Sequence, residues 1–168
     1  MKKTLLTLVS LLMAAVFAFG FAACSGAAKT KSFDVDALAA DVFKNCKFDD
    51  ADLAKSGDSE FTVCQVCNAD PALIAGETGS KKAAAYVAAS PEMIICIEAV
   101  DEAAAQKIMA DTFEPLIKTY IEEYTNYSPA EVNKLKDAVK IVEGKYVIVV
   151  VCADNAQAEA YINAYPGN

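Results

Sequence analysis

The residues of this sequence that are best spaced for chemistry are two cysteines, in the run Cys64-Gln65-Val66-Cys67. This spacing suits a redox dithiol or one half of a zinc site. A reactive dithiol usually opens a helix, because the helix N-terminus lowers the pKa of the thiol. Here the predicted helix start, Asp70-Pro71, comes after the second cysteine, and no basic residue lies within or beside the motif. The sequence therefore favours unreactive thiols, with a structural disulfide, redox chemistry and metal binding as alternatives in that order.

A zinc site would need two ligands besides Cys64 and Cys67. The sequence contains no histidine, so Cys46, Cys96 and Cys152 would have to supply them. Cys96 and Cys152 lie in apolar predicted strands, where a cysteine usually serves as a small core residue. We therefore expect no metal and no cofactor.

Other polar and aromatic groupings fit structural roles better than chemical ones. The loop 76–82 does not match a phosphate-binding loop, since its second glycine follows the first after three positions and a serine separates it from the lysines. Paired acids are typical of helix starts and solvated helix faces, and clustered tyrosines are typical of core and rim packing. The groups in question are Glu98 with Asp101, Asp101 with Glu102, Glu122 with Glu123, and the tyrosines Tyr120, Tyr124 and Tyr127. We expect no catalytic residue among them and no enzymatic activity.

The N-terminal 24 residues have the layout of a secretory signal. Lys2 and Lys3 precede an apolar run over residues 5–19, and small residues lead to Cys24. The end of this segment, Phe21-Ala22-Ala23-Cys24, resembles the lipobox of bacterial lipoproteins. The resemblance implies acylation of the Cys24 sulfur and cleavage before Cys24, with residues 1–23 removed as the signal peptide. Residues 24–32 would then be the lipidated cysteine and a flexible tether with a mean reach of about 15 Å.

Composition excludes several classes of function. All 15 basic residues are lysines, and there is no arginine, histidine or tryptophan. The usual general base near neutral pH and the bidentate fork for phosphate are both missing. The formal charge of −8 argues against nucleic acid as a partner. Removal of residues 1–23, which hold two lysines and no acid, would leave a charge of −10 and five cysteines besides Cys24, an odd number that cannot pair completely within one chain.

The rest of the chain, residues 33–168, is predicted to form one α+β domain with an antiparallel sheet of about four strands and helices packed on it. Helices are expected from Val35 to Cys46 after an Asp34 cap, from Asp101 to Tyr124 with a kink or break at Pro115, from the capping box Ser128-Pro129-Ala130-Glu131 to Ala138, and from Asp154 or Asn155 to Ala164. Strands are expected at 83–89, 92–99, 139–142 and 145–152, the last two as a hairpin around Glu143-Gly144. Residues 55–60 read as a loop and 61–67 as a short apolar stretch of undefined type.

The second half of the chain resembles a small domain-of-unknown-function family of secreted lipoproteins from Firmicutes-type bacteria. The resemblance is carried by Asn126-Tyr127-Ser128-Pro129-Ala130-Glu131-Val132, by Gly144-Lys145-Tyr146-Val147 and by Glu92-Met93-Ile94-Ile95. It implies a location and a fold, and it transfers no catalytic residue.

These observations predict a non-enzymatic lipoprotein on the extracytoplasmic face of a bacterial cell membrane. Its partners would be membrane lipid, through acylated Cys24, and an unidentified protein or small molecule. The alternative function is a thiol-redox lipoprotein that uses Cys64 and Cys67.

Overall fold

The computed structural model describes residues 31–167. Along the chain the helices and strands are α2 (Val35–Asn45), β1 (Ala54–Lys55), α3 (Ser59–Phe61), the π-helix η1 (Thr62–Val66), the 3₁₀-helix η2 (Pro71–Leu73), β2 (Ala83–Val87), β3 (Met93–Glu98), α4 (Glu102–Ile108), the π-helix η3 (Met109–Phe113), α5 (Glu114–Tyr127), the 3₁₀-helix η4 (Pro129–Glu131), α6 (Val132–Lys136), β4 (Val139–Glu143), β5 (Tyr146–Val151) and α7 (Asn155–Ala164).

The strands form one antiparallel sheet in the order β1-β2-β3-β5-β4, so the predicted α+β class is confirmed. The sequence predicted about four strands, and the structure has a fifth, the two-residue β1, which overlaps the stretch read as a loop only at Lys55. Because β1 is so short, it carries no alternation of apolar and polar residues that would mark a strand. It covers one end of β2 through the pairs Ala54 with Val87 and Lys55 with Tyr86.

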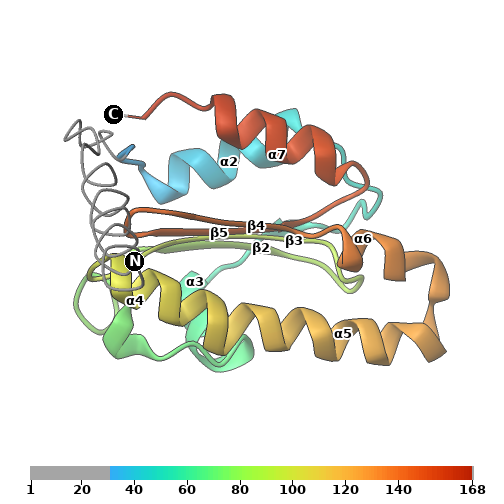
Figure 1. Cartoon of the computed structure of the whole chain (residues 1–168), viewed down its shortest axis with the longest axis horizontal. Coiled ribbons are helices and arrows are strands. Elements are labelled where there is room, and N and C mark those ends of the chain that lie inside the picture. Colours follow the sequence, from blue (N-terminus) through green and yellow to red (C-terminus); the bar gives the residue numbers. More distant parts are fainter. Residues whose placement is uncertain (1–30, 168) are drawn as a thin grey trace, which may run out of the picture.

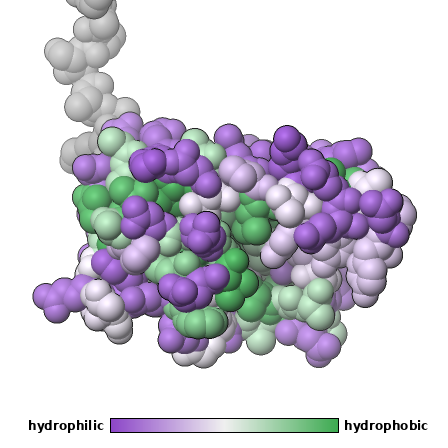
Figure 2. All heavy atoms as spheres, turned by 90° about the horizontal axis from the view of Figure 1, so that it is seen from below, coloured by the Kyte–Doolittle hydropathy of each residue, from purple (hydrophilic) through white to green (hydrophobic). Residues whose placement is uncertain are grey.

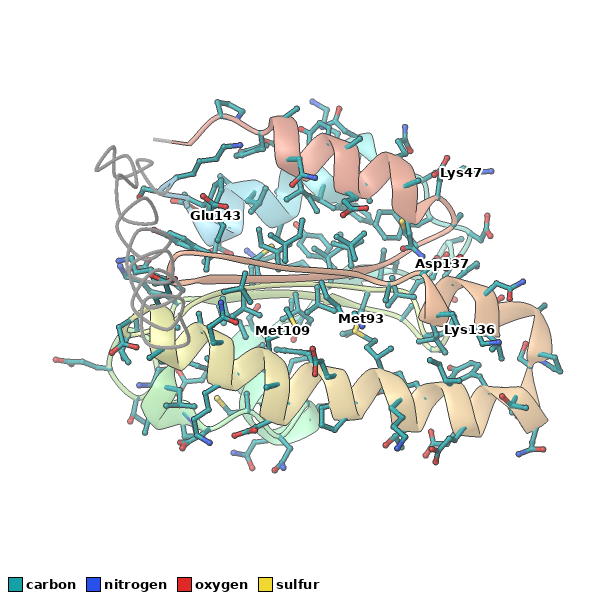
Figure 3. The ribbon with its side chains drawn as sticks, viewed as in Figure 1. Lys47, Met93, Met109, Lys136, Asp137 and Glu143 are labelled. Carbon is teal, nitrogen blue, oxygen red and sulfur yellow. The ribbon has the colours of Figure 1, made fainter. Side chains whose placement is uncertain are left out.

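Helices cover both faces of the sheet (Figure 1). The helices α2 and α7 pack on one face, and the long path α4-η3-α5 packs on the other. Side chains alternate between the two cores along β3, with Ile94 and Cys96 toward α2 and α7 and Met93, Ile95 and Ile97 toward the long helix. Figure 3 shows Met93 and Met109 in the layer between the sheet and the long helix. β3 is therefore the central strand of the sheet, with two apolar faces.

The hairpin of β4 and β5 is also confirmed, with its turn one residue later than predicted. Glu143 pairs with Tyr146, so Gly144 and Lys145 are the two turn residues. Gly144 has φ 55, at the first central position of the turn, where a two-residue hairpin favours glycine. The turn places the Lys145 side chain beside the end of β3, where it reaches Glu98.

The chain stays helical past Pro115, but the regular α-helix is interrupted just before it, so the predicted kink or break takes the form of a π-helix. The π-helix η3 lies directly before the proline, and the Glu114 N–H donates to the Met109 carbonyl five residues earlier. A proline in a regular α-helix lacks one donor and presses its ring against the preceding turn. The wider π turn gives the ring the space that a regular turn would deny it.

One further local prediction, the capping box at Ser128, was wrong. Ser128 makes no side-chain capping bond, and the Glu131 carboxylate instead lies 3.0 Å from Lys134 Nζ, so the predicted capping box does not form. The stretch 61–67, whose type the sequence left undefined, is mostly helical, because Asp58 caps α3 by accepting from the Phe61 N–H and the turn continues into η1.

Candidate functional site

Cys64 and Cys67 lie at the end of a helical segment. Cys64 is inside η1, and Cys67 follows η1 with its N–H donating to the Thr62 carbonyl. The sequence placed the pair in a stretch before a helix start, so the local structure differs from the expectation. The consequence for the thiols is the same, because neither one sits at the positive end of a helix.

Both thiols are free and buried, with 8% of Cys64 and 7% of Cys67 exposed. Burial raises the pKa of Cys64, and the nearby Glu60 carboxylate adds to this, while Lys81 opposes it. Burial also raises the pKa of Cys67 to about 11, with a further contribution from Cys64. A thiol with a raised pKa holds little thiolate at neutral pH and is a slow nucleophile. The Lys81 contribution could not be read from the motif, since it comes from the loop that precedes β2.

A hollow of about 380 Å³ lies beside Cys64. Phe61, Cys64 and Gln65 form one wall, and Pro71 and the loop at Gly79 lie opposite. Phe61 and Val66 are 56% and 58% exposed next to it. They belong to α3 and η1, on the side of the sheet that Figure 2 presents, where apolar side chains gather between charged ones.

The loop 76–82 is held in place by Glu60. The Glu60 carboxylate accepts from the backbone N–H groups of Gly79 and Lys81, both at 3.0 Å. These two hydrogen bonds lower the pKa of Glu60. The loop is therefore docked against α3, as its polar composition and two glycines allow.

The remaining cysteines do not join Cys64 and Cys67. Cys96 and Cys152 are fully buried on the α2 side of the sheet, whereas Cys64 and Cys67 lie on the α5 side. Cys46 is half-buried near Cys152, and burial raises the pKa of Cys152 to about 11. Within residues 31–167, no group of three or more cysteine or acidic side chains is placed to hold a metal ion.

The most buried charge in the described residues is the Glu92 carboxylate, whose side chain is fully buried at the start of β3. It accepts from the backbone N–H groups of Asp49, at 2.9 Å, and Asp50, at 2.8 Å. Lys134 Nζ on α6 lies 3.0 Å from Glu92, and also 3.0 Å from both Asp49 and Glu131. Burial opposes the charge on Lys134, but the bonds to these three carboxylates raise its pKa overall. This charged cluster ties the loop after α2 to the sheet and to α6.

A second charged cluster lies at the other end of β3. Lys145 Nζ donates to Glu98 Oε1 at 2.6 Å, and Lys82 Nζ contacts Glu98 Oε2 at 3.1 Å. Burial would raise the pKa of Glu98, but the hydrogen bonds from both lysines lower it. The hydrogen bond to Glu98 likewise raises the pKa of Lys145. Asp101, which the sequence paired with Glu98, instead caps α4 by accepting from the Ala104 N–H at 2.7 Å.

The three tyrosines of α5 form a row along the helix. Ring centroids of Tyr120 and Tyr124 are 6.3 Å apart, and those of Tyr124 and Tyr127 are 6.0 Å apart. Tyr120 and Tyr124 are packed against the core, and Tyr127 is 84% exposed. The rings are inclined by 55° and 85°, so they form no flat platform on which a planar ligand would stack.

Comparison with family models, curated proteins and solved structures gave no match. Cys24 and most of the predicted tether lie outside the described residues. Among residues 31–167, no helix combines the length and the apolar character needed to cross a membrane.

Proposed function

We propose that this chain is a lipoprotein whose folded domain is anchored through acylated Cys24 on the extracytoplasmic face of a bacterial membrane and acts there as a non-enzymatic binding module. The observation that carries the proposal is the order of the first 24 residues: two lysines, an apolar run, small residues and then Cys24. The resemblance to secreted lipoproteins of unknown function agrees with this assignment. Membrane lipid would be one partner, and an unidentified protein or small molecule the other.

The attachment of Lys31 to the domain supports a short tether. Lys31 Nζ donates to the carbonyls of Asn163, at 2.7 Å, and Tyr165, at 3.2 Å, at the end of α7. The carbonyl end of a helix favours a cation, so this contact holds the start of the domain in place. Gly167 also packs against Lys31 so closely that an added Cβ would lie 2.8 Å from the Lys31 Cβ.

Six residues, 25–30, then separate Cys24 from the fixed Lys31. A flexible chain of that length spans about 13 Å on average. The acylated sulfur would therefore hold the end of the domain that carries Lys31 and the β4–β5 turn nearest to the lipid. The opposite end, with α6 and the start of α7, would face away from the membrane (Figures 1 and 3).

The burial of Cys64 and Cys67 supports a binding module over the thiol-redox alternative. Exchange with a disulfide substrate requires an accessible thiolate. Both thiols are more than nine-tenths buried, and burial raises the pKa of both.

Membrane fractionation of cells that express the full chain tests the anchor. The full-length protein should sediment with membranes and be released by detergent, whereas Cys24→Ala should not be acylated. Cys46→Ala is the matched control, since Cys46 is a free cysteine outside the signal, and it should fractionate as the unmodified protein does. Equal acylation of Cys24→Ala and the unmodified protein would refute the proposal.

A further inference from the structure

A surface hollow lies at the end of the domain where the tether joins it. Its volume is about 690 Å³, and it opens between the start of α2 and the ends of β2, β3 and β5. The residues that matter for its chemistry are Lys81, Lys82, Glu98, Lys145 and Tyr146. Ser32, the residue after the fixed Lys31, lines it as well, so the hollow is adjacent to the point where the tether joins the domain.

The sheet fixes two lysines on either side of one carboxylate in this hollow. Glu98 ends β3, and its backbone N–H donates to the Lys82 carbonyl, while the Ala99 N–H donates to the Lys145 carbonyl. The two lysines thus lie on the strand neighbours of Glu98, and both side chains turn to it. The carboxylate side chain is 11% exposed, whereas those of Lys82 and Lys145 are 54% and 44% exposed.

This arrangement leaves cationic donors free toward the hollow. An ammonium group has three N–H donors, and Lys145 donates one of them to Glu98 at 2.6 Å. One lysine would suffice to balance the charge of Glu98, and there are two. Lys81 adds a third ammonium, which donates only to the carbonyls of Ile74 and Gly76 among the described residues.

The other carboxylates of the hollow are already occupied. Asp36 pairs with Lys55 at 2.6 Å, and Asp34 caps α2 by accepting from the Ala37 N–H. The hollow is thus lined by three lysines and three carboxylates, and two of these carboxylates, Asp34 and Asp36, have partners of their own, in a chain whose formal charge is −8. The hollows beside Cys64 and beside the start of α7 are instead lined by more carboxylates than lysines.

Neutral donors complete the lining. The hydroxyl groups of Tyr146 and Ser32 lie 3.2 Å apart, and Ser80 lines the hollow as well. The start of α2, whose Ala37 N–H already donates to Asp34, also lies at this end.

We infer that this hollow is a binding site for a phosphate group. Lys82 and Lys145 would donate to the phosphate oxygens, and Glu98 holds the two lysine side chains in position. This goes beyond the proposed function, since the site belongs to the domain whether or not Cys24 is acylated. Paired ammonium groups and hydroxyls are suitable donors to phosphate oxygens, and they form strong charge-assisted hydrogen bonds. The phosphate would belong to a lipid headgroup or to a soluble phosphate compound.

The site can be tested with inorganic phosphate on a fragment of residues 25–168, which lacks the signal and Cys24 but keeps both apolar cores, since their members lie between residues 33 and 162. Backbone NMR shifts are followed in a titration with sodium phosphate, against sodium chloride at equal ionic strength. Phosphate should produce saturable shifts at Lys82, Lys145 and the start of α2 in the millimolar range. Absence of saturable shifts, or equal shifts with chloride, would overturn the inference.

Variants locate the binding. Lys145→Met should weaken phosphate binding about tenfold or more, because it removes one charged donor. Lys47→Met is the matched control, an exposed lysine that Figure 3 shows at the opposite end of the domain from Glu143, and it should bind as the unmodified fragment does. Since loss of Lys145 disturbs the buried Glu98, Ser80→Trp is a second variant, which obstructs the hollow from an exposed loop position. Unchanged phosphate binding by Ser80→Trp and Lys145→Met would place the phosphate elsewhere and contradict the inference.

Sedimentation with phosphatidylglycerol vesicles distinguishes the two sources of the phosphate. Co-sedimentation that Ser80→Trp abolishes would assign a lipid headgroup. A fragment that binds inorganic phosphate but stays in the supernatant would assign a soluble compound. If the fragment binds neither probe, the site is refuted, while the acylation of Cys24 remains a separate question decided by fractionation of the full chain.

Discussion

Replacing Lys134 by methionine should destabilise the domain much more than replacing Lys136, the other lysine of α6. Lys134 is the cation that balances Glu92, whose side chain is fully buried, and its Nζ lies 3.0 Å from three carboxylates. Methionine keeps the length and apolar stem of the side chain, so the change isolates the loss of charge. Glu92 would then remain buried with only the backbone N–H groups of Asp49 and Asp50 as partners.

The expected cost is about 3–5 kcal/mol, the range for removing one partner of a buried ion pair. A domain of this kind has a total stability of about 5–15 kcal/mol, so the variant should lose a large share of it. The double variant Glu92→Gln/Lys134→Met should be more stable than Lys134→Met alone, because it leaves no unpaired buried charge. The coupling between the two positions is therefore expected to be favourable and well above 1 kcal/mol.

Urea unfolding of the 25–168 fragment, followed by circular dichroism, measures these differences; tryptophan fluorescence cannot be used, because the chain has no tryptophan. Lys136→Met is the matched control, since Lys136 is an exposed lysine of the same helix and should change the free energy of unfolding by less than about 0.5 kcal/mol. If Lys134→Met cost no more than Lys136→Met, Glu92 would not depend on Lys134 and the reasoning would be refuted.

Three further predictions concern the core, the thiols and the acid response. Val149→Asp should lower the melting temperature severely or abolish folding, because Val149 is fully buried in β5 between two strands, and an unchanged melting temperature would contradict this placement. Alkylation of the folded fragment should be faster at half-buried Cys46 than at Cys67, whose pKa is raised to about 11, and a Cys67 midpoint below about pH 7 would favour the redox alternative. Hydrogen bonds lower the pKa of Asp49 and Glu98 below their unfolded values, so their stabilisation is fully present above about pH 5 and is lost as pH falls through the lower folded values. An unfolding free energy that stayed constant from pH 5 to about pH 2 would disprove this.

The sheet was predictable from sequence because its strands carry a repeating signal. The apolar runs of β3 and β5 each extend over six residues, and Gly144 marks the turn between β4 and β5. The short β1 and the π turn before Pro115 carry no comparable repeat. Asp58 did signal a helix start before Phe61, but the polar residues around it were read as a loop.

The two charged clusters could not be predicted, because they join residues far apart in the chain. Lys134 is 42 positions from Glu92, and Lys145 is 47 positions from Glu98. Neither lysine differs from its neighbours in local sequence pattern. Only the order of the strands brings Lys82 and Lys145 to either side of Glu98. The spacing of Cys64 and Cys67 is visible in the sequence, but the burial of the two side chains is not.

Intact mass spectrometry of the full-length protein extracted from membranes tests the anchor most directly. The mature protein should begin at Cys24 and carry the added mass of a diacylglyceryl group on that residue. A protein that retains residues 1–23, or that begins at another residue with no lipid mass, would contradict the proposed function.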